Sequence, residues 1–147
     1  MITIEKIIKN QKNQTIVKFL NLTIDKHIKS ADEVSRWDEG GILFFEKYAK
    51  KLPDETKQIV GIHNVLINET SGEIFAFHFG RGTFVFKPDF ESKNLKNSDH
   101  LRIGNTVDAQ VDFRQLGHEW ALLDRIADED DDEEQLVLAY EFSKKTI

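Results

Sequence analysis

The chain of 147 residues contains no cysteine. This absence excludes disulfide bonds and zinc sites built on cysteine, and it fits a protein that stays in a reducing compartment. The N-terminus carries no apolar stretch of signal-peptide length, and no run approaches the roughly 18–20 apolar residues of a membrane span. We therefore expect a soluble cytoplasmic protein that does not interact with a membrane.

The chain also has fewer basic than acidic residues, and the difference comes from one segment. The sequence has 20 Lys and Arg against 26 Asp and Glu, a net charge of −6. Residues 128–134 are seven consecutive acids, and without them the balance would be 20 − 19 = +1. An acidic surface repels nucleic acid and anionic lipid, so we expect neither as a direct partner.

Hydrophobic periodicity predicts helices in the first third of the chain. Apolar residues recur at steps of three and four within 4–8 and again within 16–20, which predicts two short helices separated by the polar segment 10–14. Residues 30–33 have the capping-box pattern, which predicts the start of a longer helix. Pro53 would end that helix, because proline cannot donate a backbone hydrogen bond.

The next part of the chain has the pattern of strands. Residues 58–67 are rich in Ile and Val, and 68–72 have the composition of a turn. Phe75, Phe77 and Phe79 then alternate with smaller side chains, which predicts that they share one face of a strand. A second alternation of Phe follows a pair of glycines, so this region predicts three strands joined as hairpins.

The last third is predicted as a loop followed by further strands. Residues 91–105 are polar and indicate a loop, while 107–113 alternate and indicate a strand with one buried face. Residues 120–126 predict another strand. We interpret 135–143 as the last strand, although the same apolar residues also fit one face of a helix. On this interpretation the acidic run is the hairpin loop between the last two strands.

Together these elements predict a single domain of the α+β class over residues 1–147. The helical part, from about residue 1 to 53, would cover one face of a mainly antiparallel sheet of five or six strands. That sheet would be built from about residues 57–147.

The candidates for catalysis are the five histidines His27, His63, His78, His100 and His118. His63 and His78 could lie on neighbouring strands and serve as the general acid and base of a small hydrolase or ribonuclease. Histidines in this number are nevertheless common in a domain that has no catalytic role. His118, Glu119 and Asp124 lack the spacing of a helical zinc motif, so we predict neither a metal site nor a cofactor.

The acidic run is the candidate binding surface. Consecutive carboxylates attract Lys- and Arg-rich proteins and speed their association, and acids nearby in the sequence would extend the field. The predicted contact residues are Asp108, Asp112, Glu119, Asp124, Asp128, Glu129, Asp130, Asp131, Asp132, Glu133 and Glu134. The alternative interpretation of the run is a solvated loop without a partner.

A small acidic chain that lacks cysteine and catalytic motifs and is rich in Lys, Asn and Ile resembles the small bacterial immunity proteins of contact-dependent and polymorphic toxin systems. The resemblance lies in the profile of the class. It implies a non-enzymatic inhibitor that is a monomer or weak dimer alone and binds a cognate basic toxin, a nuclease, one to one in the cytoplasm. Its carboxylates would occupy the place of phosphates in the toxin's cleft.

Two other functions stay open at this point. One is a regulatory or structural module in which the acidic loop is incidental. The other is the small histidine-dependent hydrolase or ribonuclease.

Overall fold

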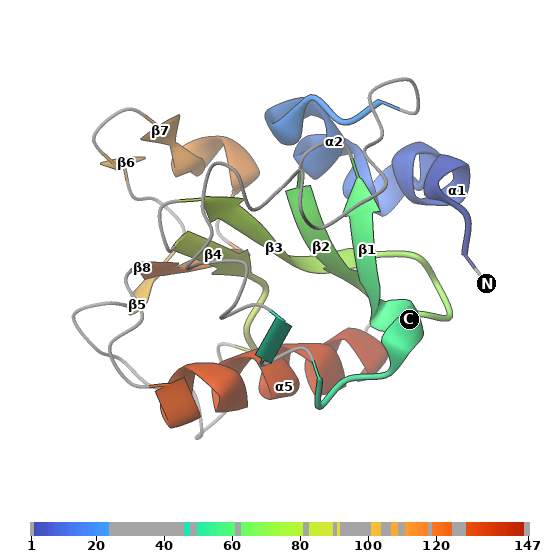
Figure 1. The fold of residues 1–147 in the computed structure, drawn as a ribbon. Coiled ribbons are helices and arrows are strands. Elements are labelled where there is room, and N and C mark those ends of the chain that lie inside the picture. The colour runs from blue at the N-terminus through green and yellow to red at the C-terminus, as the bar shows by residue number, and fades with distance from the viewer. Residues whose placement is uncertain are drawn as a thin grey trace.

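The computed structural model describes residues 2–23, 46–47, 50–60, 63–80, 83–89, 91, 101–103, 107–108, 111–117, 119–124 and 129–145. Over these residues the fold is α+β, with an antiparallel six-stranded sheet between two layers of helix (Figure 1). The predicted fold class and the predicted size of the sheet are confirmed.

The first helical layer is formed by two short helices, α1 (Ile4–Lys9) and α2 (Gln14–Leu20), which the 3₁₀ turn Gln11–Asn13 connects. Thr3 caps α1 by accepting a hydrogen bond from the Lys6 N–H. The two helices and the polar break between them were both predicted. Most of the predicted helix after residue 30 lies outside the described residues.

The sheet has the strand order β1-β2-β3-β4-β8-β5, and every neighbouring pair is antiparallel. Its strands are β1 (Lys57–Val60), β2 (His63–Ile67), β3 (Ile74–Gly80), β4 (Thr83–Phe86), β5 (Leu101–Ile103) and β8 (Ala121–Asp124). The single strand predicted over 58–67 is therefore two strands, and β5 lies in the predicted loop. β2 is buried along its whole length, so its sequence carries no alternation to mark where it begins.

Both faces of the sheet are buried, each under a different helical layer. One face packs against α1, α2 and the 3₁₀ turn η3 (Phe113–Leu116), with Phe77 near its centre. The other face packs against the C-terminal helix α5 (Glu129–Lys145), which supplies Leu136, Ala139 and Tyr140 to that core. The predicted helices thus cover one face, and a helix that was not predicted covers the other (Figure 1).

A β-bulge on β3 separates two phenylalanines that were predicted to share a face. Leu66 pairs with Ala76 and Ile67 pairs with Ile74, so Phe75 has no partner in the register. The extra residue turns Phe75 toward α5, where its ring lies 5.8 Å from that of Tyr140. Phe77 lies on the opposite face, with ring centroids 5.7 Å from Trp120 and 6.3 Å from Phe19.

The strand predicted over 135–143 is wrong, because these residues belong to α5. The acidic residues 129–134 are therefore the start of a helix and not a hairpin loop. Leu136, Ala139, Tyr140 and Ser143 recur at helical spacing and are all buried, which leaves an apolar stripe that covers the sheet. Acidic residues are favourable in the first turn of a helix, because the helix dipole is positive there.

The strand predicted over 107–113 is also wrong in extent. Val107–Asp108 (β6) and Val111–Asp112 (β7) pair with each other as a separate two-stranded sheet, so the chain reverses between them. In the described part of the chain, no helix has the length and apolar character to cross a membrane.

Candidate functional site

The turn between β2 and β3 joins the sheet to both helical layers. On the side of α1 and α2, the Asn13 side chain has no solvent exposure. It donates hydrogen bonds to the Ile7 carbonyl at 2.8 Å and the Gly72 carbonyl at 2.9 Å, and it accepts one from the Ile74 N–H at 2.7 Å. A fully used buried amide of this kind holds the turn in one position against the helices.

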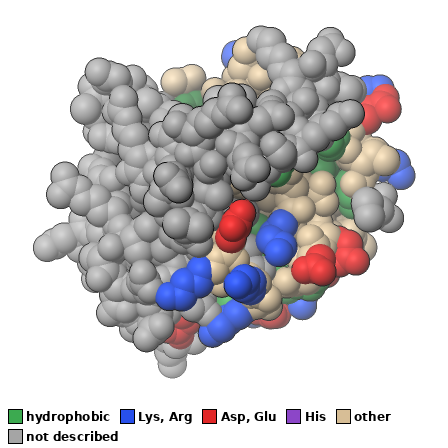
Figure 2. All heavy atoms as spheres, viewed as in Figure 1, with side chains coloured by type: hydrophobic (Ala, Val, Ile, Leu, Met, Phe, Trp, Pro, Cys, Tyr) green, Lys and Arg blue, Asp and Glu red, His purple; other side chains and the backbone are tan. Residues whose placement is uncertain are grey.

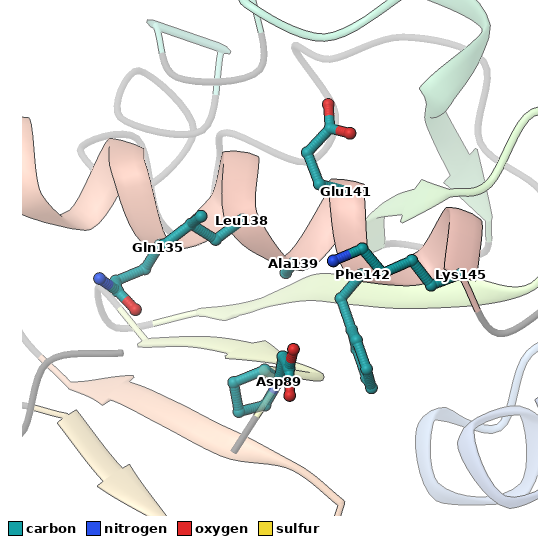
Figure 3. Close-up of a pocket in the computed structure, with 8 residues that line it drawn as sticks. Asp89, Gln135, Leu138, Ala139, Glu141, Phe142 and Lys145 are labelled. Atoms are coloured by element: carbon teal, nitrogen blue, oxygen red, sulfur yellow. The ribbon is translucent and has the colours of Figure 1, made fainter. Parts of the chain in front are cut away.

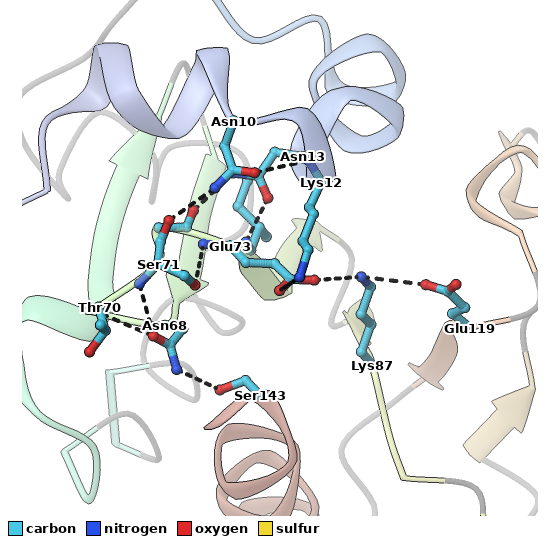
Figure 4. A network of polar contacts seen from close by, with 12 residues as sticks. Asn10, Lys12, Asn13, Asn68, Thr70, Ser71, Glu73, Lys87, Glu119 and Ser143 are labelled. Atoms are coloured by element: carbon cyan, nitrogen blue, oxygen red, sulfur yellow. Dashed lines mark hydrogen bonds and ion pairs between the residues drawn. The ribbon is translucent and has the colours of Figure 1, made fainter. Parts of the chain in front are cut away.

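On the other side, the same turn is bonded to α5. Asn68 accepts hydrogen bonds from the N–H groups of Thr70 and Ser71, and it donates one to Ser143 Oγ at 3.3 Å (Figure 4). The Tyr140 hydroxyl donates to Glu69 Oε1 at 2.6 Å. Burial of the hydroxyl, as the larger cause, and its hydrogen bond to Glu69, as the second cause, raise the pKa of Tyr140 above its ordinary value. The hydroxyl therefore keeps the proton that it donates.

A groove with a volume of about 810 Å³ opens beside this turn, between α5 and the N-terminal helices. Phe75, Pro88, Ala139 and Phe142 give it an apolar surface. Its charged lining residues are Lys12, Glu73, Lys87, Asp89, Glu91 and Glu119. The volume and the mixed lining are typical of protein sites that bind a ligand or a segment of a partner.

Three ion pairs cross one wall of the groove. Lys87 Nζ lies 3.1 Å from Glu73 Oε1 and 3.4 Å from Glu119 Oε2, and Lys12 Nζ lies 3.8 Å from Glu73 Oε2 (Figure 4). Lys87 also lies 5.2 Å from the centre of the Trp120 ring. The Glu73 side chain is only 9% exposed, so its charge needs these lysines to offset the loss of hydration.

A second, smaller cavity of about 70 Å³ continues along α5 (Figure 3). It shares Pro88, Asp89, Ala139 and Phe142 with the groove. Gln135 and Leu138 extend its lining toward the start of the helix. The two cavities therefore follow α5 toward its acidic end.

The structure distributes the predicted contact acids over several elements. Residues 129–134 share the start of α5, and Glu134 is exposed, whereas Asp128 lies outside the described residues. Asp124 ends β8. The Glu119 carboxylate does not join the acidic end of α5, because it is paired with Lys87 in the groove.

Asp108 and Asp112 belong to the β6–β7 pair, which lies on the α2 side of the sheet in Figure 1, away from α5. The backbone thus separates them from residues 129–134. On the face seen in Figure 2, the described basic and acidic side chains are interspersed. This mixture agrees with a sequence whose charges nearly balance once the acidic run is set aside.

The two histidines suggested as a catalytic pair lie on neighbouring strands, as predicted, but inside the protein. His63 is 8% exposed and His78 is fully buried. His63 Nδ1 lies 3.3 Å from the His78 carbonyl oxygen, and the His78 ring stacks on Phe84 with centroids 4.9 Å apart. Burial lowers the pKa of His63 below its ordinary value. Neither lines the groove or the smaller cavity, so both pack the core.

The structure offers no support for the remaining histidines as catalytic residues or for a metal site among the described residues. His27, His100 and His118 lie outside the described residues. Within the described ranges, no three His, Asp or Glu side chains form a group that could hold a metal ion.

Sequence reasoning missed the groove altogether. Its residues come from the 3₁₀ turn and α2, the β2–β3 turn and β3, the segments after β4 and before β8, and α5, which are far apart in the chain. Each of them is ordinary in its own local sequence, so no short motif could have identified the site.

Comparison with known protein families, with curated proteins and with solved structures finds no match to this chain.

Proposed function

We propose that this protein binds and neutralises a basic partner protein, in the manner of a bacterial immunity protein that inhibits a nuclease toxin. The acidic helix end, residues 129–134 of α5, is the proposed main contact. One observation carries the proposal. Six consecutive acids begin a helix in which the next basic residue is Lys144.

This arrangement is poorly matched to the needs of the helix itself. Like charges three or four residues apart repel on a helix, by about 0.2–0.5 kcal/mol for each pair. Residues 129–134 contain three pairs at a spacing of three and two at a spacing of four. The helix dipole returns about 0.3–1 kcal/mol, and only in the first turn. A Lys- and Arg-rich surface would relieve the remaining repulsion.

A nuclease is a suitable partner because its active site binds phosphate and therefore carries positive charge. Carboxylates on a helix end could take the place of those phosphates and block the cleft. The burial of His63 and His78 favours such a binding role over catalysis by this pair.

The test uses two variants that lose the same amount of charge. The first carries Asp131→Asn, Asp132→Asn, Glu133→Gln and Glu134→Gln in the acidic helix end. The control carries Glu5→Gln, Glu46→Gln, Asp54→Asn and Glu55→Gln, four exposed acids in other parts of the chain. The native chain and both variants are used to capture the partner from the native lysate, and their association rates are measured.

We expect a basic captured protein whose nuclease activity is lost at one equivalent of the native chain. The first variant should associate about tenfold more slowly at low salt and show a weaker dependence on salt, while the control should resemble the native chain. The proposal fails if the two variants associate at the same rate, or if the captured protein stays active in the complex.

A further inference from the structure

The groove beside α5 has an apolar floor that the described residues leave open. Phe75 and Ala139 are almost fully buried beneath it, and Phe142 and Pro88 complete the lining. A volume of about 810 Å³ is larger than several apolar side chains together. An apolar group that entered from a partner would leave water for this surface and gain about 25 cal/mol for each Å² that it buried.

The charges of the groove favour a cation. Its described lining carries four carboxylates, Glu73, Asp89, Glu91 and Glu119, against the two ammonium groups of Lys12 and Lys87. Both lysines are used in pairs with Glu73 or Glu119. Asp89 and Glu91 pair with no described cation, and Asp89 Oδ1 only accepts the Glu91 N–H at 3.0 Å.

Besides Asp89 and Glu91, the Glu73 carboxylate also lines the groove. The residue is only 7% exposed, and its Oε2 atom makes no hydrogen bond within the described part of the chain. Lys12 Nζ lies 3.8 Å from Oε2, and the Lys12 side chain is 57% exposed. A guanidinium group from outside could therefore reach Glu73 after a small movement of Lys12.

The form of the site favours an extended chain over a compact small molecule. The groove and the smaller cavity share four lining residues, and their lining follows α5 from Ser143 to Gln135. Gln135 directly follows the acidic helix end, so a segment lying in the groove would lead to residues 129–134.

From these observations we infer that the groove binds an extended peptide segment in which an apolar side chain is flanked by Lys or Arg. The apolar side chain packs against Phe75, Ala139 and Phe142, and the cation pairs with Asp89 and Glu91. This inference rests on the proposed function in one respect, which is that the basic partner supplies the segment.

The test needs no knowledge of the partner. Three capped tripeptides, acetyl-Arg-Phe-Arg-amide, acetyl-Glu-Phe-Glu-amide and acetyl-Arg-Gly-Arg-amide, are titrated into the isotope-labelled protein while backbone amide resonances are followed by NMR. We expect the first peptide to shift the resonances of Asp89, Glu91 and residues 139–143 in a saturable manner. The other two should bind at least tenfold more weakly.

Two matched variants locate the contact. Asp89→Asn with Glu91→Gln should weaken binding of the Arg-Phe-Arg peptide at least tenfold. Glu46→Gln with Glu55→Gln removes the same charge from exposed positions that line neither cavity and should leave binding unchanged. The inference is overturned if the three peptides bind alike, if none shifts these resonances, or if the two variants bind the peptide equally.

The same reagents separate this inference from the proposed function. The variant of the acidic helix end should bind the Arg-Phe-Arg peptide as the native chain does, since it keeps the groove carboxylates Asp89 and Glu91 that hold the peptide's cations. If that variant loses the captured partner but the peptide never binds, the groove inference is wrong and the proposed function stands. If the peptide binds in the groove and the acidic helix end proves irrelevant, peptide binding stands and the proposed contact is wrong.

Discussion

The two faces of the sheet are buried in different ways. The face under α1, α2 and η3 is closed by interlocking aromatic and aliphatic side chains, with Asn13 bonded to the β2–β3 turn. The face under α5 is closed only in part, and a groove lined by carboxylates remains beside the helix. A helical layer can therefore stabilise the fold without filling all the space beside it. We propose that the first face serves stability alone and that the groove beside the second face binds a partner.

Truncating one phenylalanine on each face should give the largest change in stability and tests whether the two faces are equally closed. Phe77→Ala should lower the free energy of unfolding by about 4–5 kcal/mol, because it leaves an enclosed cavity between Phe19 and Trp120. Phe75→Ala should cost about 3 kcal/mol, since the space that it leaves opens into the groove. Urea denaturation of both variants measures the two costs, and equal values would mean that the faces are equally closed.

Replacing the buried Asn13 should give the next largest loss of stability. Asn13→Ala removes the partner of two carbonyl oxygens and one N–H, so we expect a loss of about 2–4 kcal/mol in the free energy of unfolding. Hydrogen exchange of the Ile74 amide should accelerate in the same variant. An unchanged Ile74 exchange rate would show that Asn13 does not anchor the turn.

The corresponding link on the groove side should be weaker. Tyr140→Phe removes one hydrogen bond to Glu69 and keeps the ring that packs on Phe75, so we expect a loss of about 1–2 kcal/mol. Thermal denaturation, read as the shift in Tm against the native chain, measures it. A loss as large as that of Asn13→Ala would contradict the expectation that the one hydrogen bond of Tyr140 contributes less than the three of Asn13.

Much of the fold could be predicted where local chemistry decides the structure. The apolar spacing and polar break of residues 4–20 specify α1 and α2, and the turn residues at 68–72 specify the β2–β3 hairpin. The bulge that turns Phe75 away from Phe77 could not be read from alternation, because the sequence alternates through it without interruption.

Part of the candidate site could be predicted from the sequence, and part could not. The acidic run is visible in the sequence because its residues are consecutive, although its helical state was not predicted. The groove gathers Glu73, Lys87, Asp89 and Phe142 from separate segments, so only the folded chain shows that they meet.

Composition and short-range spacing are enough to predict an α+β fold, two short helices ahead of the strands, and a negative charge concentrated between residues 128 and 134. The helical state of 135–143 depends on packing in the folded chain, since the apolar residues there fit both a strand and a helix. The second face of the sheet must be covered, and the stripe of Leu136, Ala139 and Tyr140 covers it when the segment coils into α5.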